Sequence, residues 1–163
     1  MNRSIIFITG MSGSGKSTIL EELSKRGFRT IDTDLDDFCV YTFDDKFQEF
    51  GWLWNEDKMQ RLIKSHQTGI LFIAGTVSNQ GMYYRYFDEI IYLSTSLNNL
   101  IERVQQRTNN PYGKTKEEQK TIQSDYERFD SVIKKGASII IDTSSPLEMI
   151  VDKIEYIAQQ KIK

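Results

Sequence analysis

Apolar residues along this chain form two patterns, short continuous runs and stretches with helical spacing, and the two patterns alternate. The continuous runs are bounded by glycine or polar residues, which favours buried strands, and they occupy residues 4–9, 28–31, 70–74, 89–93 and 138–141. Between and after these runs, apolar side chains recur every three or four residues, which predicts helices. Five strands that alternate with helices are typical of an α/β fold, in which helices cover both faces of one parallel sheet.

Three segments show neither pattern. Residues 38–54 are rich in aromatic and acidic side chains and show no clear periodicity. We expect some helix there and leave the rest of their structure open. Residues 75–86 are expected to form a polar and aromatic loop, and residues 108–115 consist almost entirely of turn-forming residues. Because the chain has no internal repeat and no linker-like stretch, residues 1–163 are expected to form a single domain.

The composition narrows the class of protein. A chain of 163 residues with 39% hydrophobic residues can bury one good core. Its 21 Lys and Arg against 23 Asp and Glu give a formal net charge of -2, which provides no overall positive field for nucleic acid or an anionic membrane. No apolar run approaches the roughly 20 residues that span a bilayer, and the single cysteine, Cys39, cannot form an internal disulfide. We therefore expect a cytoplasmic protein without a membrane or nucleic-acid partner.

A glycine-rich motif joins the first predicted strand to the first predicted helix. It has the phosphate-loop (P-loop) pattern of glycine, four residues, glycine, lysine and serine. Such glycines let backbone N–H groups approach phosphate oxygens, and the following helix presents its positive N-terminus to the same anion. Lys16 would supply a charge for the β- and γ-phosphates, and Ser17 a hydroxyl for magnesium. The predicted nucleotide-binding residues of this motif are Gly10, Met11, Ser12, Gly13, Ser14, Gly15, Lys16, Ser17 and Thr18.

The position of an acidic pair distinguishes among P-loop proteins. Signalling GTPases carry aspartate-x-x-glycine and asparagine-lysine-x-aspartate sequences, and neither occurs in this chain. Motor and AAA-type ATPases usually end an apolar strand with an acidic pair, but the strand at 70–74 runs into Gly75-Thr76-Val77-Ser78. The pair follows the second predicted strand instead, as Asp32 and Asp34.

With this pair, the chain resembles the shikimate kinase and gluconate kinase branch of the nucleoside-monophosphate-kinase-like P-loop family over nearly its whole length. The resemblance also rests on the arginine-bearing helical segment Arg103 to Arg107 before the short lid, on Arg128, and on Ile141-Asp142-Thr143. It implies a three-layer P-loop NTPase fold with a five-stranded parallel sheet, an acceptor-binding subdomain at about 35–68 and a short lid at about 108–115. It further implies ATP as the phosphate donor and Mg²⁺ as the cofactor.

The resemblance assigns roles to several of these residues. Asp32 would join Ser17 at the metal, and Asp34 would meet the acceptor hydroxyl as a general base; the alternative is a solvated acidic turn that caps the next helix. Arg107 would close over the transferring phosphoryl group, or would simply be a helix-end cation that interacts with the dipole. Finally, the resemblance places Arg103, Arg107 and Thr143 at the nucleotide and Arg128 at the acceptor.

The acceptor site departs from the shikimate kinase pattern. The chain has no glycine triplet after the third strand and no clear arginine after Asp34 to grip a carboxylate, which argues against shikimate itself. Aromatic, amide and hydroxyl groups stand there instead and suit a ring-bearing polar acceptor. If the stretch around residues 52–54 is extended, we expect only one of Trp52 and Trp54 to face inward. His66 has no partner at metal-ligand spacing and is expected at the surface. The predicted acceptor-binding residues are Asp34, Trp54, Arg61, Ser78, Asn79, Gln80 and Arg128.

These observations favour a magnesium-dependent phosphotransferase that moves the γ-phosphate of ATP to a hydroxyl of a small metabolite. A nucleotide kinase remains the first alternative and would need basic residues such as Arg61 in the acceptor cleft. A nucleotide-binding regulatory protein or a polynucleotide-end kinase is the second, and the acidic balance of charge argues against it. The sequence leaves the acceptor and the oligomeric state open.

Overall fold

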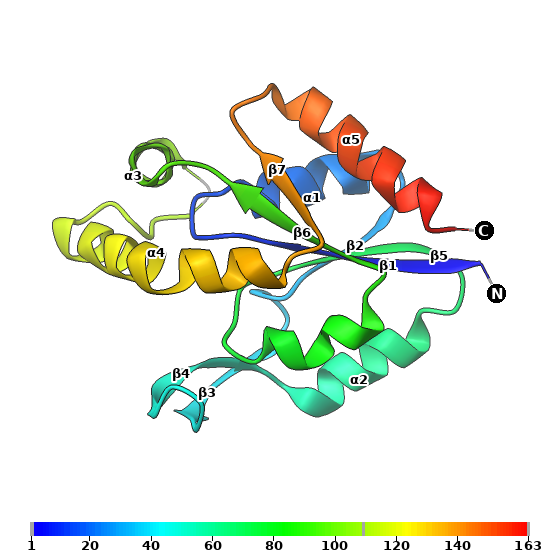
Figure 1. Cartoon of the computed structure of the whole chain (residues 1–163), viewed down its shortest axis with the longest axis horizontal. Coiled ribbons are helices and arrows are strands. Elements are labelled where there is room, and N and C mark those ends of the chain that lie inside the picture. The colour runs from blue at the N-terminus through cyan, green and yellow to red at the C-terminus, as the bar shows by residue number, and fades with distance from the viewer. Residues whose placement is uncertain (1, 109, 163) are drawn as a thin grey trace.

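The continuous apolar runs form the strands of one parallel sheet in the computed structural model, which describes residues 2–108 and 110–162 (Figure 1). The strand order is β2-β5-β1-β6-β7. The strands are β1 (Arg3–Thr9), β2 (Arg29–Asp32), β5 (Gly69–Ala74), β6 (Glu89–Ser94) and β7 (Ile139–Asp142). Strand β1 lies at the centre and is buried along most of its length, because helices cover both of its faces. The predicted α/β fold with five parallel strands is therefore confirmed.

Two hydrophobic clusters lie on opposite faces of this sheet (Figure 1). One face is covered by α1 (Lys16–Lys25) and α5 (Leu147–Gln160), and its cluster includes Ile6, Leu23 and Ile154. The other face is covered by α2 (Glu56–Ser65) and the 3₁₀ helix η1 (Gln80–Tyr86), where the structure has a helix inside the expected loop. Alternate side chains of β1 enter the two clusters, which fixes the strand between the layers.

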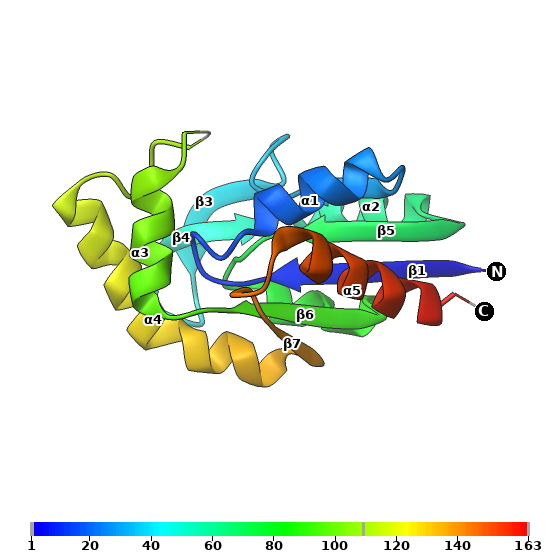
Figure 2. The ribbon, with the colours of Figure 1, turned by 90° about the horizontal axis from the view of Figure 1, so that it is seen from above.

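Helix α3 (Leu97–Gln106) stands beyond the carboxyl ends of the strands, and α4 (Lys116–Gly136) begins there and runs back beside β6 to the start of β7 (Figure 2). The longer one, α4, begins with a capping box in which Thr115 and Glu118 satisfy each other's backbone N–H groups. The predicted lid, residues 108–115, connects these helices, and its residue 109 lies outside the described residues. No helix within the described residues is long and apolar enough to cross a membrane.

The segment 38–54, expected to contain some helix, is instead an antiparallel hairpin of β3 (Cys39–Asp44) and β4 (Glu49–Trp54). Aromatic residues pair across the two strands, with ring centroids 5.3 Å apart for Tyr41 and Trp52 and 5.4 Å apart for Phe43 and Phe50. Such cross-strand pairs stabilise a ribbon. Because these rings are largely exposed, the strands lack the buried, apolar face by which sequence reasoning recognises a strand.

Candidate functional site

The P-loop follows β1 directly and opens α1, as the motif predicts. Gly13 and Gly15 have φ values of +86° and +105°, in the left-handed region that favours glycine. A Cβ atom on Gly13 would also lie 2.9 Å from the carbonyl oxygen of Leu100 on α3. The loop therefore needs glycine at this position both for its turn and for its close packing against a neighbouring helix.

The ammonium group of Lys16 is folded back onto the P-loop. Its Nζ donates hydrogen bonds to the carbonyl oxygens of Gly10 at 2.6 Å and Met11 at 3.2 Å. Burial lowers the pKa of Lys16 to about 8; the charges of Asp34 and Asp32 oppose this shift, and the charge of Arg107 adds to it. An anion placed against this group would favour its charged form, so the lysine is suited to receive a phosphate.

Ser17 and Asp32 lie together at the start of α1. The Ser17 hydroxyl donates to Asp32 Oδ2 at 3.2 Å, while Asp32 Oδ1 accepts from the backbone N–H of Asp34 at 3.0 Å. Hard oxygen atoms of this kind suit Mg²⁺, which proteins commonly hold with one or two side chains and the phosphates of a substrate. The described residues contain no group of three or more His, Cys, Asp or Glu that could hold a metal alone. The predicted pair Ser17 and Asp32 therefore fits a magnesium ion shared with a nucleotide.

A cavity of about 560 Å³ opens beside the P-loop. Its walls come from the P-loop, the β3–β4 hairpin, the segment 76–84 and α4. Lys16 and Asp34 both line it, and so do the predicted residues Ser78 and Gln80. Burial raises the pKa of the Asp34 carboxyl; the charge of Lys16 opposes this rise and the charge of Asp32 adds to it. The cavity thus has a carboxylate of increased basicity and the P-loop lysine among its lining residues.

Trp54 and Asn79 do not line this cavity. Trp54 is only 2% exposed and packs against the rings of Phe7 and Tyr83 at 5.3 Å. The Asn79 side chain accepts from the backbone N–H of Trp54 at 2.9 Å and donates to its carbonyl oxygen at 3.2 Å. Asn79 therefore fixes the end of β4, and the placement of both residues disagrees with the predicted contact with an acceptor.

Trp52, and not Trp54, lines the cavity. As expected, only one of the two faces inward, but it is not alternation along the strand that separates them, because residues two apart on a strand share a face. The register pairs Trp52 with Tyr41 and Trp54 with Cys39, so the two tryptophans differ in depth, with Trp52 60% exposed.

Neither predicted acceptor-site arginine forms a wall of the cavity. Arg61 is exposed on α2, where its Nε donates to the Asp57 carbonyl oxygen at 3.3 Å. Arg128 on α4 does not line the cavity and pairs with Glu49 of the hairpin at 2.7 Å. Its guanidinium stands over the ring of Phe129 at 4.8 Å. The sequence missed Phe47, Glu49 and Asp125, which line the cavity and belong to no motif, whereas Tyr84, which also lines it, is in the segment expected across the acceptor cleft.

Arg103 and Thr143 come together next to the P-loop, as predicted for the nucleotide side. Arg103 donates to Thr143 Oγ1 at 2.9 Å and to its carbonyl oxygen at 3.0 Å, with longer bonds of 3.4 Å to the carbonyl oxygens of Gly13 and Ser14. Arg107 donates to the Tyr112 carbonyl oxygen at 2.7 Å, and its buried Nε has no hydrogen-bond partner among the described residues. Burial lowers the pKa of Arg107. This arginine is thus tethered to the lid segment with one donor still free.

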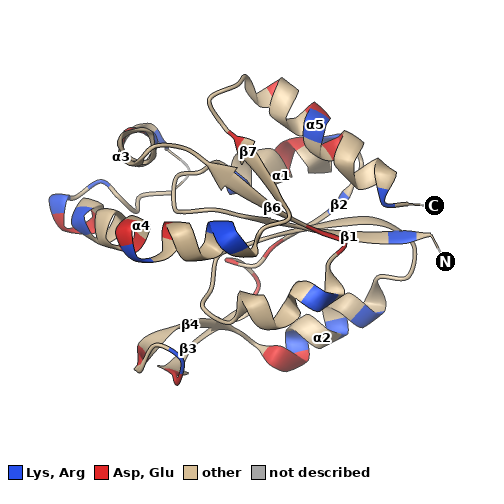
Figure 3. Ribbon diagram, in the orientation of Figure 1, with Lys and Arg blue, Asp and Glu red and all other residues tan. Residues whose placement is uncertain are grey.

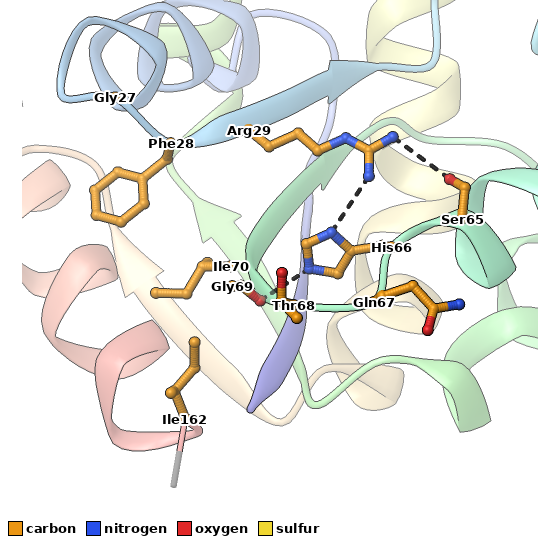
Figure 4. A pocket seen from close by; sticks show the side chains of 10 residues that line it. All are labelled: Gly27, Phe28, Arg29, Ser65, His66, Gln67, Thr68, Gly69, Ile70 and Ile162. Carbon is orange, nitrogen blue, oxygen red and sulfur yellow. Dashed lines mark hydrogen bonds between the residues drawn. The ribbon is translucent and has the colours of Figure 1, made fainter. Parts of the chain in front are cut away.

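His66 is buried, with 3% exposure, and not at the surface as expected. It lies in a second cavity of about 580 Å³ at the amino ends of β2 and β5, the opposite end of the strands from the P-loop (Figure 4). Its Nε2 lies 2.8 Å from the Gly69 carbonyl oxygen and must donate to it, so Nδ1 accepts from Arg29 at 3.3 Å. The histidine is therefore satisfied by the fold and ties the end of α2 to the sheet.

Comparisons with known proteins agree with this architecture. A family model described as an AAA domain matches residues 6–124. A shikimate kinase of Chlorobium chlorochromatii (strain CaD3) is 27% identical over 134 residues, 77% of this chain and 70% of that protein.

Two solved structures have the same fold at low identity. The shikimate kinase from Acinetobacter baumannii in complex with shikimate has a TM-score of 0.63 at 16% identity, covering 98% of this chain and 96% of that one. A gluconokinase from Sinorhizobium meliloti 1021 has a TM-score of 0.60 at 16% identity, covering 96% and 94%. The resemblance to the shikimate and gluconate kinase branch is confirmed.

Proposed function

The chain belongs to the family of P-loop proteins described as AAA domains, and on this premise we propose that it is a kinase. The position of its acidic pair after the second strand differs from the usual arrangement in AAA-type ATPases. The proposed reaction moves the γ-phosphate of ATP to a hydroxyl group of a small polar metabolite. The observation that carries the proposal is that Lys16 and Asp34 line the same cavity of about 560 Å³. In this proposal Lys16 binds the phosphates and Asp34 acts as the base at one acceptor site.

In the proposed mechanism, the acceptor hydroxyl attacks the γ-phosphorus and the bond from this phosphorus to the bridging oxygen of ADP breaks. Asp34 accepts the hydroxyl proton, because burial makes its carboxylate more basic than an exposed one. Lys16 leaves the carbonyl oxygens of Gly10 and Met11 and binds the β- and γ-phosphates. Ser17 and Asp32 would hold a magnesium ion, which would supply positive charge to neutralise the phosphates.

Arg103 of α3 and Arg107, which follows its end, divide between structure and catalysis in this proposal. Arg103 holds the P-loop against Thr143 and so shapes the nucleotide side of the site. Arg107 has a free Nε and is tethered to the lid segment, which suits an arginine that approaches the phosphates when the lid closes. Stabilisation of transition-state charge by such arginines contributes about 10³ to 10⁵ in rate in related reactions.

The two alternatives have less support. A nucleotide kinase needs cations for an acceptor phosphate, but Arg61 does not line the cavity and Arg128 is engaged by Glu49. Lys46 does line the cavity, but it is exposed at the turn of the hairpin. A polynucleotide kinase needs a basic stripe along its surface. Figure 3 shows both signs of charge along α2 and α4, and the net charge of the chain is -2.

A screen for acceptor-dependent release of ADP tests the proposal. The purified chain with Mg-ATP is tested against shikimate, gluconate, sugars, cyclitols, nucleosides, nucleoside monophosphates and an oligonucleotide. We expect one small hydroxyl-bearing class to raise ADP release well above the background hydrolysis, and Lys16→Ala to abolish that increase. An increase with nucleoside monophosphates or the oligonucleotide alone would select an alternative, and an active Lys16→Ala variant would refute the role of the P-loop.

A further inference from the structure

A buried glutamine organises the cavity wall opposite the hairpin. Gln80 is 4% exposed, and its Oε1 accepts from the backbone N–H of Val77 at 2.9 Å. Since a backbone N–H can only donate, this bond fixes which end of the amide carries the nitrogen. Both N–H groups of Nε2 are then used, one toward Thr9 Oγ1 at 3.2 Å and one toward the Tyr84 hydroxyl at 2.7 Å. Gln80 lines the cavity but has no N–H group left for a ligand.

The direction of these bonds determines what Tyr84 can do. Its hydroxyl oxygen accepts from Gln80, so its own proton remains available as a donor. Tyr84 lines the cavity, and its hydroxyl makes no other hydrogen bond with the described residues. The ring packs closely against α4, because a Cβ on Gly136 would lie 2.9 Å from its Cε2 atom. Tyr84 thus brings one free donor to the cavity wall.

The same network reaches the P-loop lysine. The Thr76 hydroxyl donates its one proton to the Gly10 carbonyl oxygen at 2.5 Å. In the 3.2 Å contact between the Thr76 and Thr9 hydroxyls, Thr9 must therefore be the donor. The Gly10 carbonyl oxygen also accepts from Lys16. A directed chain of hydrogen bonds therefore links Tyr84 to the group that holds Lys16 in place, and fixes the position of Tyr84 relative to the phosphate site.

The charges on the other side of the cavity restrict what this donor can bind. Glu49 and Asp125 line the cavity, and the nearby Arg128 already pairs with Glu49 at 2.7 Å. Lys46 also lines the cavity, but it stands at the exposed turn of the hairpin with its Nζ 5.3 Å from the centre of the Phe47 ring. The other lining lysine, Lys16, belongs to the proposed phosphate site. On this side of the cavity a ligand carboxylate would therefore meet two carboxylates and, among the described lining residues, only the exposed Lys46 as a cation. An uncharged oxygen meets no such repulsion.

We propose that the Tyr84 hydroxyl, oriented by Gln80, binds the acceptor, and that the acceptor is an uncharged polyol ring with a hydroxyl or ether oxygen at this point. This inference rests on the proposed kinase function and names its acceptor class. Phe47, Trp52 and Phe129 supply aromatic walls for the ring. Tyr84 determines specificity, whereas Gln80 is a positioning residue that acts through Tyr84.

Three variants separate this role from a purely structural one. Tyr84→Phe removes the donor and keeps the ring. Gln80→Glu keeps the size of the side chain but replaces the donating amide with an acceptor, which turns the Tyr84 proton away from the cavity. Tyr83→Phe is the matched control, because Tyr83 is a neighbouring tyrosine that is 3% exposed and lies in the hydrophobic cluster instead of the cavity wall. Thermal unfolding of each variant checks that it folds.

The probes are myo-inositol, ribose and adenosine as uncharged acceptors, and shikimate and gluconate as carboxylates. We expect turnover with an uncharged acceptor, an increase of about tenfold in its KM in Tyr84→Phe and Gln80→Glu, and an unchanged KM for ATP. Tyr83→Phe should match the wild type. Turnover with a carboxylate alone, or an unchanged acceptor KM in Tyr84→Phe, would overturn the inference while the kinase function stands. If no probe and no other acceptor raises ADP release, the kinase function itself fails.

Discussion

Replacement of Lys16 by methionine should abolish turnover and yet stabilise the nucleotide-free protein. Burial lowers the pKa of Lys16 from 10.5 to about 8, a difference that corresponds to roughly 3.4 kcal/mol of unfavourable free energy for the charged form in the folded chain. The variant also loses the two hydrogen bonds to Gly10 and Met11, each worth about 1 kcal/mol. The expected net gain is about 1 to 2 kcal/mol at pH 7, or a rise of about 2 to 8 °C in Tm.

The dependence on pH provides an internal check. Lys16 has a lower pKa in the folded chain than in the unfolded one, so the unfolded state binds more protons between pH 8 and 10.5 and the wild type gains stability across this window. Lys16→Met lacks that gain, so its advantage should be full below pH 8 and should shrink toward pH 10.5. Urea unfolding at pH 7 and pH 10 measures both differences.

Lys25→Met is the matched control, since Lys25 is an exposed lysine on the same helix that pairs with Glu22 at 3.2 Å. It should show no gain in stability at pH 7. A Lys16→Met variant that is less stable than the wild type at pH 7, or that keeps the same advantage at pH 10, would refute the unfavourable burial of the Lys16 charge.

Further predictions concern nucleotide binding, the thiol and the two tryptophans. The affinity for ATP should be nearly constant below pH 8 and should fall above it, because Lys16 then loses its charge. Calorimetric titrations from pH 7 to 9.5 measure this affinity, and a constant value across the range would contradict the prediction. Burial raises the pKa of Cys39 to about 11, so a thiol reagent at pH 8 should label it slowly until urea unfolds the chain; rapid labelling of the native protein would contradict this. Trp54→Ala should cost about 3 to 5 kcal/mol of stability, whereas Trp52→Ala should cost far less and raise the acceptor KM. Equal losses of stability in urea unfolding would show that the hairpin is placed wrongly.

The sequence predicted the sheet well because its strands are buried on both faces and appear as continuous apolar runs, as in the stretch from Ile5 to Ile8. The P-loop was also found, since glycines and a lysine at these spacings, between a strand and a helix, are typical of a phosphate-binding loop. The structure brings Ser17 next to Asp32, and Arg103 next to Thr143, in agreement with the expected pairs.

The acceptor side was harder to predict because its residues come from separate elements without a motif. Glu49 and Asp125 approach the same cavity only because the hairpin folds against α4, a contact that no local pattern encodes. His66 was misplaced for a related reason: its burial depends on Arg29, which is 37 residues away in the chain. Once the hairpin is known, two-residue periodicity identifies Trp52 and Trp54 as sharing a face.

Transfer of labelled γ-phosphate from ATP to an acceptor, compared between the wild type and Asp34→Asn, is the most decisive test of the proposed reaction. We expect a labelled small-molecule product with the wild type, a loss of at least about a hundredfold in its rate of formation in Asp34→Asn, and little change in ATP affinity. Label that appears only as inorganic phosphate with every acceptor, or an Asp34→Asn variant that transfers at the wild-type rate, would contradict the proposed transfer to a hydroxyl with Asp34 as its base.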